Sequence, residues 1–509
     1  MSVTTSFPGI YIQELPSNAH AITAAPTSVT VFVGYSHPFK TPSANYGTPI
    51  ELFSFADYER EFGGFAPSAI FDNNLPYAVS QFFLNGGGDA VVVGLKPQKY
   101  FPSGTAIGPQ AGTFTISGKE IVFTSLEPTD STPMVLAITN VNNNVADLSV
   151  TYGVQQEVYR KISLDNTSAD YLETRINGLS SLVTVTPGSG GYPTAFTGVT
   201  SPQTIQSGGA PGDNTTFATG DFTAVFQADT PLDKWPIFNL MVIPGITDPA
   251  VMSEAVAFCE RKLAFLIMDP PSADVADQAS ANYIGNYAPP LSQNAALYFP
   301  YLVSNDPTTG APVNLPPSGT VAGIYARTDV NRGVWKAPAG LETTILNTTG
   351  VVPGGVMNDQ RQGVFNNLAI DCLRTFPGVG TVVFGARTLA YPNVSLRTQW
   401  GYIPVRRMAL FLEQSLFQSL KWVIFEPNDD SLWVAIRVSI ESFMLSLFHQ
   451  GAFAGTTPSD SFQVKCDSST TTQQDIDAGQ VNIIVAFAPV KPAEFVIVKI
   501  AQLAGQAQT

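Results

Sequence analysis

This chain of 509 residues is poor in the residue types that build catalytic and metal sites. Its three histidines, His20, His37 and His449, supply too little for a histidine-based metal site or a Ser-His-Asp relay. No GxxxxGK[ST] motif occurs, and the glycine clusters in LNGGGDAVVVG and PGVGTVVFG precede strands, which is the wrong order for a dinucleotide-binding turn. The acidic loops lack the spaced ligands of a calcium loop. We therefore expect no enzyme activity, no cofactor and no metal.

Cysteine and long apolar runs are also scarce. The three cysteines lie far apart with no CxxC pair, which favours structural thiols in a reducing compartment over a disulfide framework. The first residues, MSVTTSFPG, lack the charged and apolar regions of a secretory signal. The sequence has no run of about 18 apolar residues, so we expect no transmembrane helix. We expect the protein to be made and folded in a cytoplasm.

Charged residues are scarce as well, at 13% of the chain, and acidic ones outnumber basic ones, so the formal net charge is −15. An acidic chain is not expected to bind nucleic acid directly, since phosphate contacts need basic surface. A hydrophobic content of 44% with so few charges suits a subunit that hides much of its surface in an assembly, although a large monomer could also show it. The length predicts two to four domains.

The stretch PGIYIQELPS near the start predicts a short strand with no evident partner. Apolar and polar residues alternate through Ile10, Tyr11, Ile12 and Gln13, between prolines 8 and 16. The polar stretch that follows carries no compact hairpin signal. The strand must therefore pair with something distant in the sequence or with another chain.

Two regions predict alternating helices and strands on a mixed sheet, namely 21–100 and 229–330. The pattern places a buried strand at 28–36 and a helix that begins after Ser54 and stops at Gly63. It also predicts helices over 273–286 and 319–331. Between these regions, 101–228 is rich in Gly, Ser, Thr, Asn and Pro with short β-branched runs, which predicts an inserted β-rich domain.

The last third predicts two long helices followed by extended segments. One helix runs from Val405 to Trp422, and the second ends at Gly451. The stretch VNIIVAFAPV predicts a strand, and FVIVKIAQL predicts another one, set apart by Pro489 and Pro492. Like the first strand, this last one has no evident partner.

Several stretches in this order resemble the contractile tail sheath family of phages and phage-tail-like injection systems. The chain ends PGIYIQELPS and APVKPAEFVIVKIAQ belong to this resemblance. So do NRGVWKAPAG, FPGVGTVVFGARTLA, WGYIPVRRMALFLEQSL, KWVIFEPNDDSLW and GAFAGTTPSDSFQVKCD. It covers roughly 1–60 and 325–509 well, 230–325 more loosely, and does not extend to 101–228.

The resemblance implies a multidomain α+β fold whose mixed-sheet sheath core is built from both chain ends. We expect five parts: an N-terminal arm (1–20), a central α/β domain (21–100 with 229–330), an inserted β-rich outer domain (101–228), a tube-facing C-terminal domain (331–488) and a C-terminal arm (489–509). Such subunits form stacked hexameric rings around an inner tube. Their sheath contracts with stored conformational energy and drives the tube through a target envelope.

The expected partners are therefore further copies of the chain, the inner tube protein, and baseplate and tail-terminator or cap proteins. A membrane enters only as the target of the particle. Assembly would take place in a bacterial cytoplasm, as part of a phage tail or of a phage-tail-like particle that can be released from the cell. An acidic hydrolase with an inserted β-domain is the alternative, and a capsid-like or fibre protein is a third reading.

In this family both chain ends add strands to sheets of neighbouring subunits, which would supply the missing partner for each isolated strand. The resemblance thus assigns inter-subunit pairing to the two arms, at Ile10, Tyr11, Ile12, Gln13, Phe495, Val496, Ile497, Val498 and Lys499.

Two further groups of residues receive hypotheses. Sheath subunits of this family contact the tube through a helix of the C-terminal domain, so Arg406, Arg407 and Lys421 are candidates for a basic, tube-facing surface. The alternative, which the sequence alone favours, is a solvated helix face or ion pairs within the domain. Arg332, Trp335 and Lys336 resemble a packing and hinge motif with a structural role.

Overall fold

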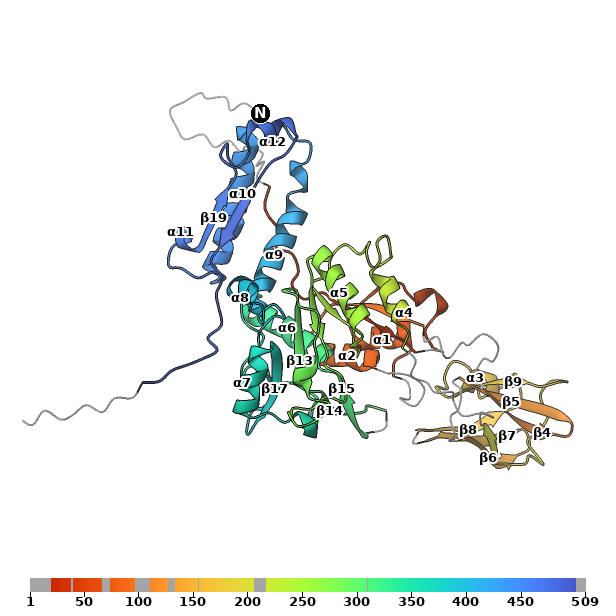
Figure 1. Ribbon diagram of the computed structural model, residues 1–509. Helices are drawn as coiled ribbons and strands as arrows, with labels where there is room; N and C mark the ends of the chain where they lie inside the picture. The colour runs from red at the N-terminus through yellow and green to blue at the C-terminus, as the bar shows by residue number, and fades with distance from the viewer. Residues whose placement is uncertain are drawn as a thin grey trace, which may run out of the picture.

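The computed structural model describes most of the chain. The described residues are 20–37, 40–65, 74–96, 110–126, 133–153, 155–205, 217–308 and 310–499. They form an α+β structure with several sheets, as the sequence predicts (Figure 1). The predicted strand at Ile10–Gln13 lies outside the described residues.

An eight-stranded mixed sheet forms the centre of the protein. Its inner strands are parallel, and only the outermost pair at each edge is antiparallel. The order is β18 (Gly380–Val383), β17 (Ile370–Phe376), β13 (Ala295–Phe299), β12 (Phe265–Met268), β11 (Leu240–Val242), β1 (Thr30–Tyr35), β3 (Ala90–Leu95) and β2 (Ile50–Leu52). Most inner strands are apolar throughout because helices cover both faces.

Two sets of helices make the apolar cores on the two faces of this sheet. One core includes side chains of α4 (Thr219–Thr223), α5 (Pro249–Lys262) and α7 (Asp359–Asn367). The other includes side chains of α1 (Phe55–Phe62), α2 (Asn74–Leu84) and α6 (Ser318–Arg332). Gly319 and Gly323 let α6 lie directly against α2, since a Cβ on either would approach the α2 backbone to 2.5 Å.

The sheet order also shows where the central body ends. Strands β17 and β18 belong to this sheet, although the predicted boundary at 330/331 places them in the C-terminal domain. Strand pairing across the sheet joins residues that are distant in sequence, and a composition-based boundary does not detect it. Beside the sheet lies a small three-stranded one, formed by β14 (Leu302–Asn305), β15 (Pro312–Leu315) and β16 (Gly350–Val351).

Local end signals predict the first helix well. The Ser54 side chain accepts a hydrogen bond from the Asp57 N–H, and Gly63 ends α1 with a φ of 84°. The helix predicted over 273–286 is wrong, because this segment forms turns and only Ile284–Asn286 is a 3-10 helix. The side chains of Asp277 and Ser280 accept bonds from nearby backbone N–H groups, and such bonds compete with helix formation.

Residues 110–205 form a separate body with its own apolar core, placed to one side of the central sheet (Figure 1). It consists mostly of strands. One sheet contains β4 (Ala111–Ile116), β5 (Lys119–Ser125) and β9 (Val183–Pro187). The other contains β10 (Gln203–Ile205), β6 (Met134–Asn142), β7 (Val145–Tyr152) and β8 (Gln155–Ser163), and α3 (Leu172–Ile176) packs beside them.

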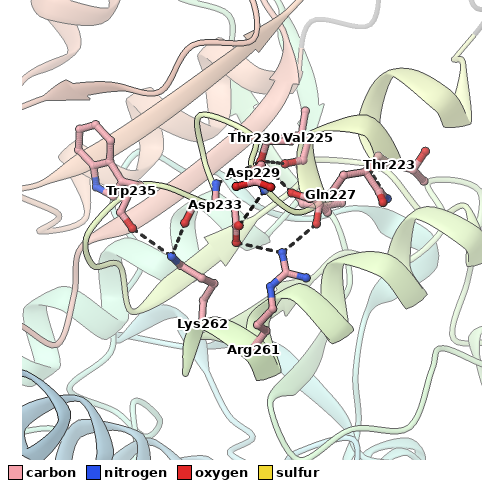
Figure 2. Close-up of polar contacts among 10 residues, drawn as sticks. Thr223, Val225, Gln227, Asp229, Thr230, Asp233, Trp235, Arg261 and Lys262 are labelled. Carbon is pink, nitrogen blue, oxygen red and sulfur yellow. Dashed lines mark hydrogen bonds and ion pairs between the residues drawn. The ribbon is translucent and has the colours of Figure 1, made fainter.

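The segment that returns from this body is fastened to the end of α5 (Figure 2). Lys262 donates to the carbonyls of Asp233 and Trp235, at 2.7 and 3.1 Å. Arg261 donates to the Asp233 carboxylate at 3.0 Å and to the Phe226 carbonyl at 3.1 Å. These contacts fix the return point of the insertion on the central body.

The third body, which we call the helical module, comprises residues 403–487. Its core lies between α9 (Ile403–Ser419) and α10 (Asp430–His449), which are joined through a tip that includes the 3-10 helix Lys421–Val423. A two-stranded sheet, β19 (Phe462–Lys465) and β20 (Ile484–Phe487), packs on these helices. The shorter helices α11 (Pro458–Ser461) and α12 (Gln473–Asp477) complete the module, and α8 (Val394–Trp400) precedes α9. Figure 1 shows the module extending from the central body.

Helix α10 is long and apolar enough to cross a membrane, by length and composition only. One face of it, which includes Ile436, Ile440 and Met444, is buried in the core of the module. A core helix passes the same test, so this feature is weak evidence for a membrane span.

Burial of Asp269 gives the central body a pH dependence. Its carboxylate follows β12 and accepts bonds from the Gly245 N–H and from the N–H and hydroxyl of Ser318, at the start of α6. Burial outweighs these bonds and raises the pKa of Asp269 to about 6. A raised carboxyl pKa contributes stability that is complete below the unfolded-state value near 3.8 and is lost as pH rises through about 6.

We expect the stability advantage of the wild type over Asp269→Asn to fall by roughly 2 kcal/mol between pH 4 and pH 7. Asparagine keeps the size of the side chain but does not titrate in this range. Urea unfolding of both proteins at several pH values measures the difference. A difference that is independent of pH would contradict the assignment.

Candidate assembly surfaces

The C-terminal segment leaves the body of the protein as an extended chain (Figure 1). Residues Phe495–Lys499, which we call the ribbon, belong to no helix or strand. Four consecutive apolar side chains are largely exposed on it, Phe495 (73%), Val496 (83%), Ile497 (82%) and Val498 (75%). Such an exposed, β-favouring run is a surface that another chain can cover.

The β19–β20 sheet has two edges without a strand partner among the described residues. The N–H of Ala488 bonds the carbonyl of Ser461, so the pairs of the ladder alternate from that point. Phe462 and Val464 on β19, and Val485 and Phe487 on β20, consequently direct their backbone groups away from the partner strand. Neither edge is paired with a further strand among the described residues, so each is a candidate for strand addition.

One face of the β19–β20 sheet packs on the core of the module, and the other face is exposed to solvent. The side chains of Phe462, Val464, Val485 and Phe487 pack on the core of the module. The opposite face exposes Gln463, Lys465, Ile484 and Ala486 to solvent. An added strand would thus extend a sheet that α9 and α10 already support.

Two other sheet edges in the described part of the chain, those at β8 and β18, are protected. In β8 a bulge opposite β7 places Lys161 at a φ of 56°, and the Asp147 side chain binds its N–H. Arg160 and Lys161 add charge to this edge, and both devices discourage strand addition. At β18, the Ile345 N–H bonds the Thr381 carbonyl, so the segment 340–345 covers that edge.

The N-terminal end of the described chain runs along α9 towards the tip of the module. The N–H groups of Thr23 and Ala25 donate to the hydroxyls of Ser419 and Ser415, each at 3.0 Å. The His20 ring stacks on Trp422 with 3.9 Å between ring centroids. His20, the first described residue, therefore lies at the tip, while the ribbon leaves from the other end of the module (Figure 1).

Arg406 and Arg407 do not form an exposed basic surface, so their assignment as tube-facing residues is corrected. The Arg407 guanidinium makes two bonds to the Asp329 carboxylate, at 2.8 and 2.6 Å, with both side chains almost fully buried. Arg406 is also buried and donates to Asn294 and Glu413. The alternative interpretation, ion pairs within the domain, describes Arg406, whereas Arg407 pairs with Asp329 of the central body.

The buried pair between Arg407 and Asp329 connects α9 to α6. Burial alone would lower the pKa of Arg407, but the Asp329 carboxylate raises it, so the guanidinium remains charged. It also lies over the Tyr325 ring at 4.7 Å and donates to the carbonyl of Thr27. This arginine thus joins the module, the central body and the N-terminal segment.

Lys421 is exposed, as the tube-facing hypothesis requires, and lies at the tip of the module. Its amine is 5.9 Å from the centre of the Phe417 ring. Phe417, Ile424 and Phe425 are also exposed there, and Phe425 has a φ of 72°. A positive φ is strained for a bulky residue and suggests that its outward position has a function.

The segment after α6 links the central body to the module. Arg332 and Lys336 both pair with Glu342, at 2.8 and 3.0 Å. Trp335 packs on the core of the module beside the buried Val334. These contacts fit the structural role expected of Arg332, Trp335 and Lys336, which remains a prediction.

Sequence reasoning missed an ion pair between the C-terminal segment and the central body. Arg387 donates through Nε and Nη2 to the two carboxylate oxygens of Glu494, at 2.9 and 2.5 Å. The Tyr402 hydroxyl adds a bond to Glu494 at 3.2 Å. Arg387 lies in the quoted stretch FGARTLA, but nothing in the sequence identifies its partner 107 positions away.

The described residues contain no group of three or more His, Cys, Asp or Glu side chains that could hold a metal ion. Cys259, Cys372 and Cys466 are buried and unpaired with one another. Burial raises the pKa of each thiol.

Two sequence models of the same family match this chain. The phage tail sheath protein central domain matches residues 237–389, and the phage tail sheath C-terminal domain matches residues 397–502. A prophage major tail sheath protein of Pseudomonas aeruginosa is 25% identical over 260 residues, which cover 50% of this chain and 62% of the relative. The tail sheath protein of Burkholderia phage BcepMu is 26% identical over 207 residues, covering 40% and 41%.

Solved structures extend the likeness over nearly the whole chain. The sheath of an extracellular contractile injection system (PVC), in its contracted state, matches with a TM-score of 0.60 and 24% identity, covering 98% of this chain and 99% of the other. The contracted helical sheath of the anti-feeding prophage matches with a TM-score of 0.58 and 23% identity, covering 98% and 100%.

The structural matches show the class of protein first: the chain has the fold of sheath proteins from contractile systems. The chain belongs to the phage tail sheath protein family. It spans about three fifths and two fifths of the lengths of the two relatives above.

Proposed function

We propose that this chain is a non-enzymatic structural subunit of a contractile sheath, in which neighbouring copies are joined by strand exchange. The observation that carries the proposal is that one chain has two complementary surfaces. The ribbon exposes an unpaired apolar segment, and the β19–β20 sheet has edges without a partner strand among the described residues. Adding the ribbon of one copy to the sheet of another satisfies both. Because the two surfaces differ, the contact is head-to-tail and generates an open helical assembly.

The N-terminal arm would take part in the same way from the opposite end of the module. The described chain begins at His20, beside Trp422 at the tip, whereas the ribbon starts near the base. A subunit with arms at two ends can connect neighbours in two directions. Flexible arms can remain paired while the rigid bodies rotate and slide, so the assembly can shorten without coming apart.

In this proposal the subunits form hexameric rings that stack around an inner tube, with a baseplate at one end and a cap at the other. The extended lattice stores the free energy that contraction releases, so no nucleotide is needed. Assembly takes place in a bacterial cytoplasm, and the particle can be released from the cell that makes it. The acidic hydrolase alternative receives no support from the family matches.

Electron microscopy of the purified chain, alone and with its tube protein, tests the proposal. We expect striated cylinders or rings of uniform width. A chain that remains monomeric with a functional tube present would contradict the proposed function.

The tip of the module is the surface that we propose for contact with the inner tube. Phe417, Lys421, Ile424 and Phe425 are exposed together there, and a fully exposed phenylalanine loses unfavourable contact with water when a partner covers it. Lys421 can add a charge contact to an acidic group on the tube. This replaces the proposed role of the two buried arginines.

We expect Phe425→Ser to reduce sheath assembly on tubes at least about tenfold, since burying one such side chain provides about 1.5–3 kcal/mol. The melting temperature should not change, because Phe425 makes no buried contact in the subunit. Phe53→Ser is the matched control, because Phe53 is also exposed but lies on the central body. Equal assembly by both variants in a pelleting assay would refute the role of the tip.

A further inference from the structure

The ion pair between Arg387 and Glu494 lies directly before the ribbon and holds its starting point on the central body. The side chains of Arg387 and Glu494 are only 3% and 15% exposed. The Arg387 guanidinium lies 3.9 Å from the centre of the Tyr391 ring and donates to the carbonyl of Asn366, and its backbone N–H donates to the buried carboxylate of Asp371. Arg387 is thus fixed from several sides, and the Glu494 carboxylate binds a rigid site.

Few other contacts hold this part of the chain. Between Val490 and Phe495 it borders a groove of about 890 Å³, so it is not packed closely on the central body along this length. The amine of Lys491 donates to the carbonyl of Thr398 at 3.2 Å, in an exposed position. Glu494 is therefore the main anchor of the segment that precedes the ribbon.

The position of the anchor decides which edges the ribbon can reach. Strand β20 ends at Phe487, and the residues from 488 to 494 separate it from the ribbon. Each extended residue advances about 3.3 Å, so these residues can carry the ribbon roughly 20 Å away from its own β19–β20 sheet. Since the ribbon begins immediately after Glu494, no linker remains in which the chain could turn back.

We infer that the Arg387–Glu494 pair is a latch that prevents the ribbon from pairing with its own β19–β20 sheet and thereby directs it to a second copy of the chain. This inference rests on the proposed strand exchange. It adds that the Arg387–Glu494 ion pair determines whether the ribbon pairs within its own chain or with another chain. An unlatched ribbon could fold back and occupy the edge that a neighbour needs. Arg387, Glu494 and Tyr402 are positioning residues for assembly.

Glu494→Ala removes the latch without touching the ribbon or the sheet. We expect it to slow assembly at least tenfold, and Glu494→Gln, which keeps one acceptor oxygen, to slow it less. Lys491→Met is the matched control, because it removes an exposed contact of the same segment, and it should assemble like the wild type. Light scattering follows assembly, and the melting temperature shows whether each variant is folded.

A distance measurement separates the latch from general damage to the arm. Spin labels at cysteines introduced by Lys499→Cys and Gln463→Cys report the separation of ribbon and sheet in dilute monomer, since the native cysteines are buried. We expect one long distance in the latched chain and in the Lys491→Met control, and an added short distance in Glu494→Ala. A single long distance in all three chains, or wild-type assembly by Glu494→Ala, would overturn the latch.

The spin-label measurement tests the latch separately from the proposed strand exchange. If the otherwise wild-type chain never assembles, strand exchange between copies fails. The monomer distances in the presence and absence of Glu494 still decide whether the latch holds the ribbon away from its own sheet.

Discussion

Replacing Asp329 with alanine is expected to lower the free energy of unfolding by about 3–5 kcal/mol, because it leaves a buried guanidinium without its partner. The side chains of Asp329 and Arg407 are only 2% and 3% exposed, so water cannot replace the lost carboxylate. The loss would also loosen α9 from α6 and from the N-terminal segment at Thr27. Urea denaturation, followed by tryptophan fluorescence, measures the change.

Asp359→Ala is the matched control for this prediction. Asp359 also binds an arginine, Arg374, at 2.8 Å, but its own side chain is 91% exposed. Exposed ion pairs contribute about 0–1 kcal/mol, so the control should be nearly neutral. If the two alanine variants lose the same stability, the Asp329–Arg407 pair does not have the structural role assigned to it.

Removing residues 495–509 is expected to abolish assembly while leaving the subunit folded. The described part of this segment, Phe495–Lys499, belongs to no sheet and the apolar cores lie elsewhere, so the melting temperature should not change. The segment contains the strand that the proposed exchange requires. Sedimentation and electron microscopy of the truncated protein with its tube measure the effect.

Single substitutions within the ribbon test the same point with less change to the chain. Proline has no backbone N–H and interrupts a strand, so Ile497→Pro should block assembly nearly as strongly as the truncation. Ile497→Val keeps a β-branched side chain and should assemble normally. Normal assembly by the proline variant would show that the ribbon does not pair as a strand.

The sequence predicted those elements that local signals determine. Ser54 and Gly63 delimit α1 because a helix start and stop depend on neighbouring residues. The stretch FVIVKIAQL was predicted as a strand from its β-branched residues, but its described part, Phe495–Lys499, belongs to no helix or strand, so its pairing with another chain stays a prediction. In contrast, the helix predicted over 273–286 fails because Asp277 and Ser280 bind the local backbone instead.

Local sequence patterns do not identify interactions between residues that are distant in the sequence. Arg406 and Arg407 follow one another at the start of an amphipathic helix, a pattern that equally describes an exposed basic face and an internal ion-pair network. The decisive partner of Arg407 is Asp329, 78 positions earlier. The latch is of the same kind, because the distance from Arg387 to Glu494 in the sequence conceals their contact.

The division of the chain into bodies was predicted only in part for the same reason. The insertion differs in composition and could be recognised, and residues 110–205 do form a core of their own. The transition from the central body to the module has no such change in composition, and β17 and β18 return to the central sheet after α6. The predicted boundary before residue 331 therefore does not coincide with the edge of that sheet.

A cryo-electron microscopy map of the assembled sheath tests the central claim most directly, because it shows which chain each strand belongs to. We expect residues Phe495–Val498 of one copy to lie as a strand on an edge of the β19–β20 sheet of a different copy, with Glu494 still bound to Arg387 of its own copy. A map in which the ribbon pairs with its own sheet, or lies along the surface without strand pairing, would contradict the account.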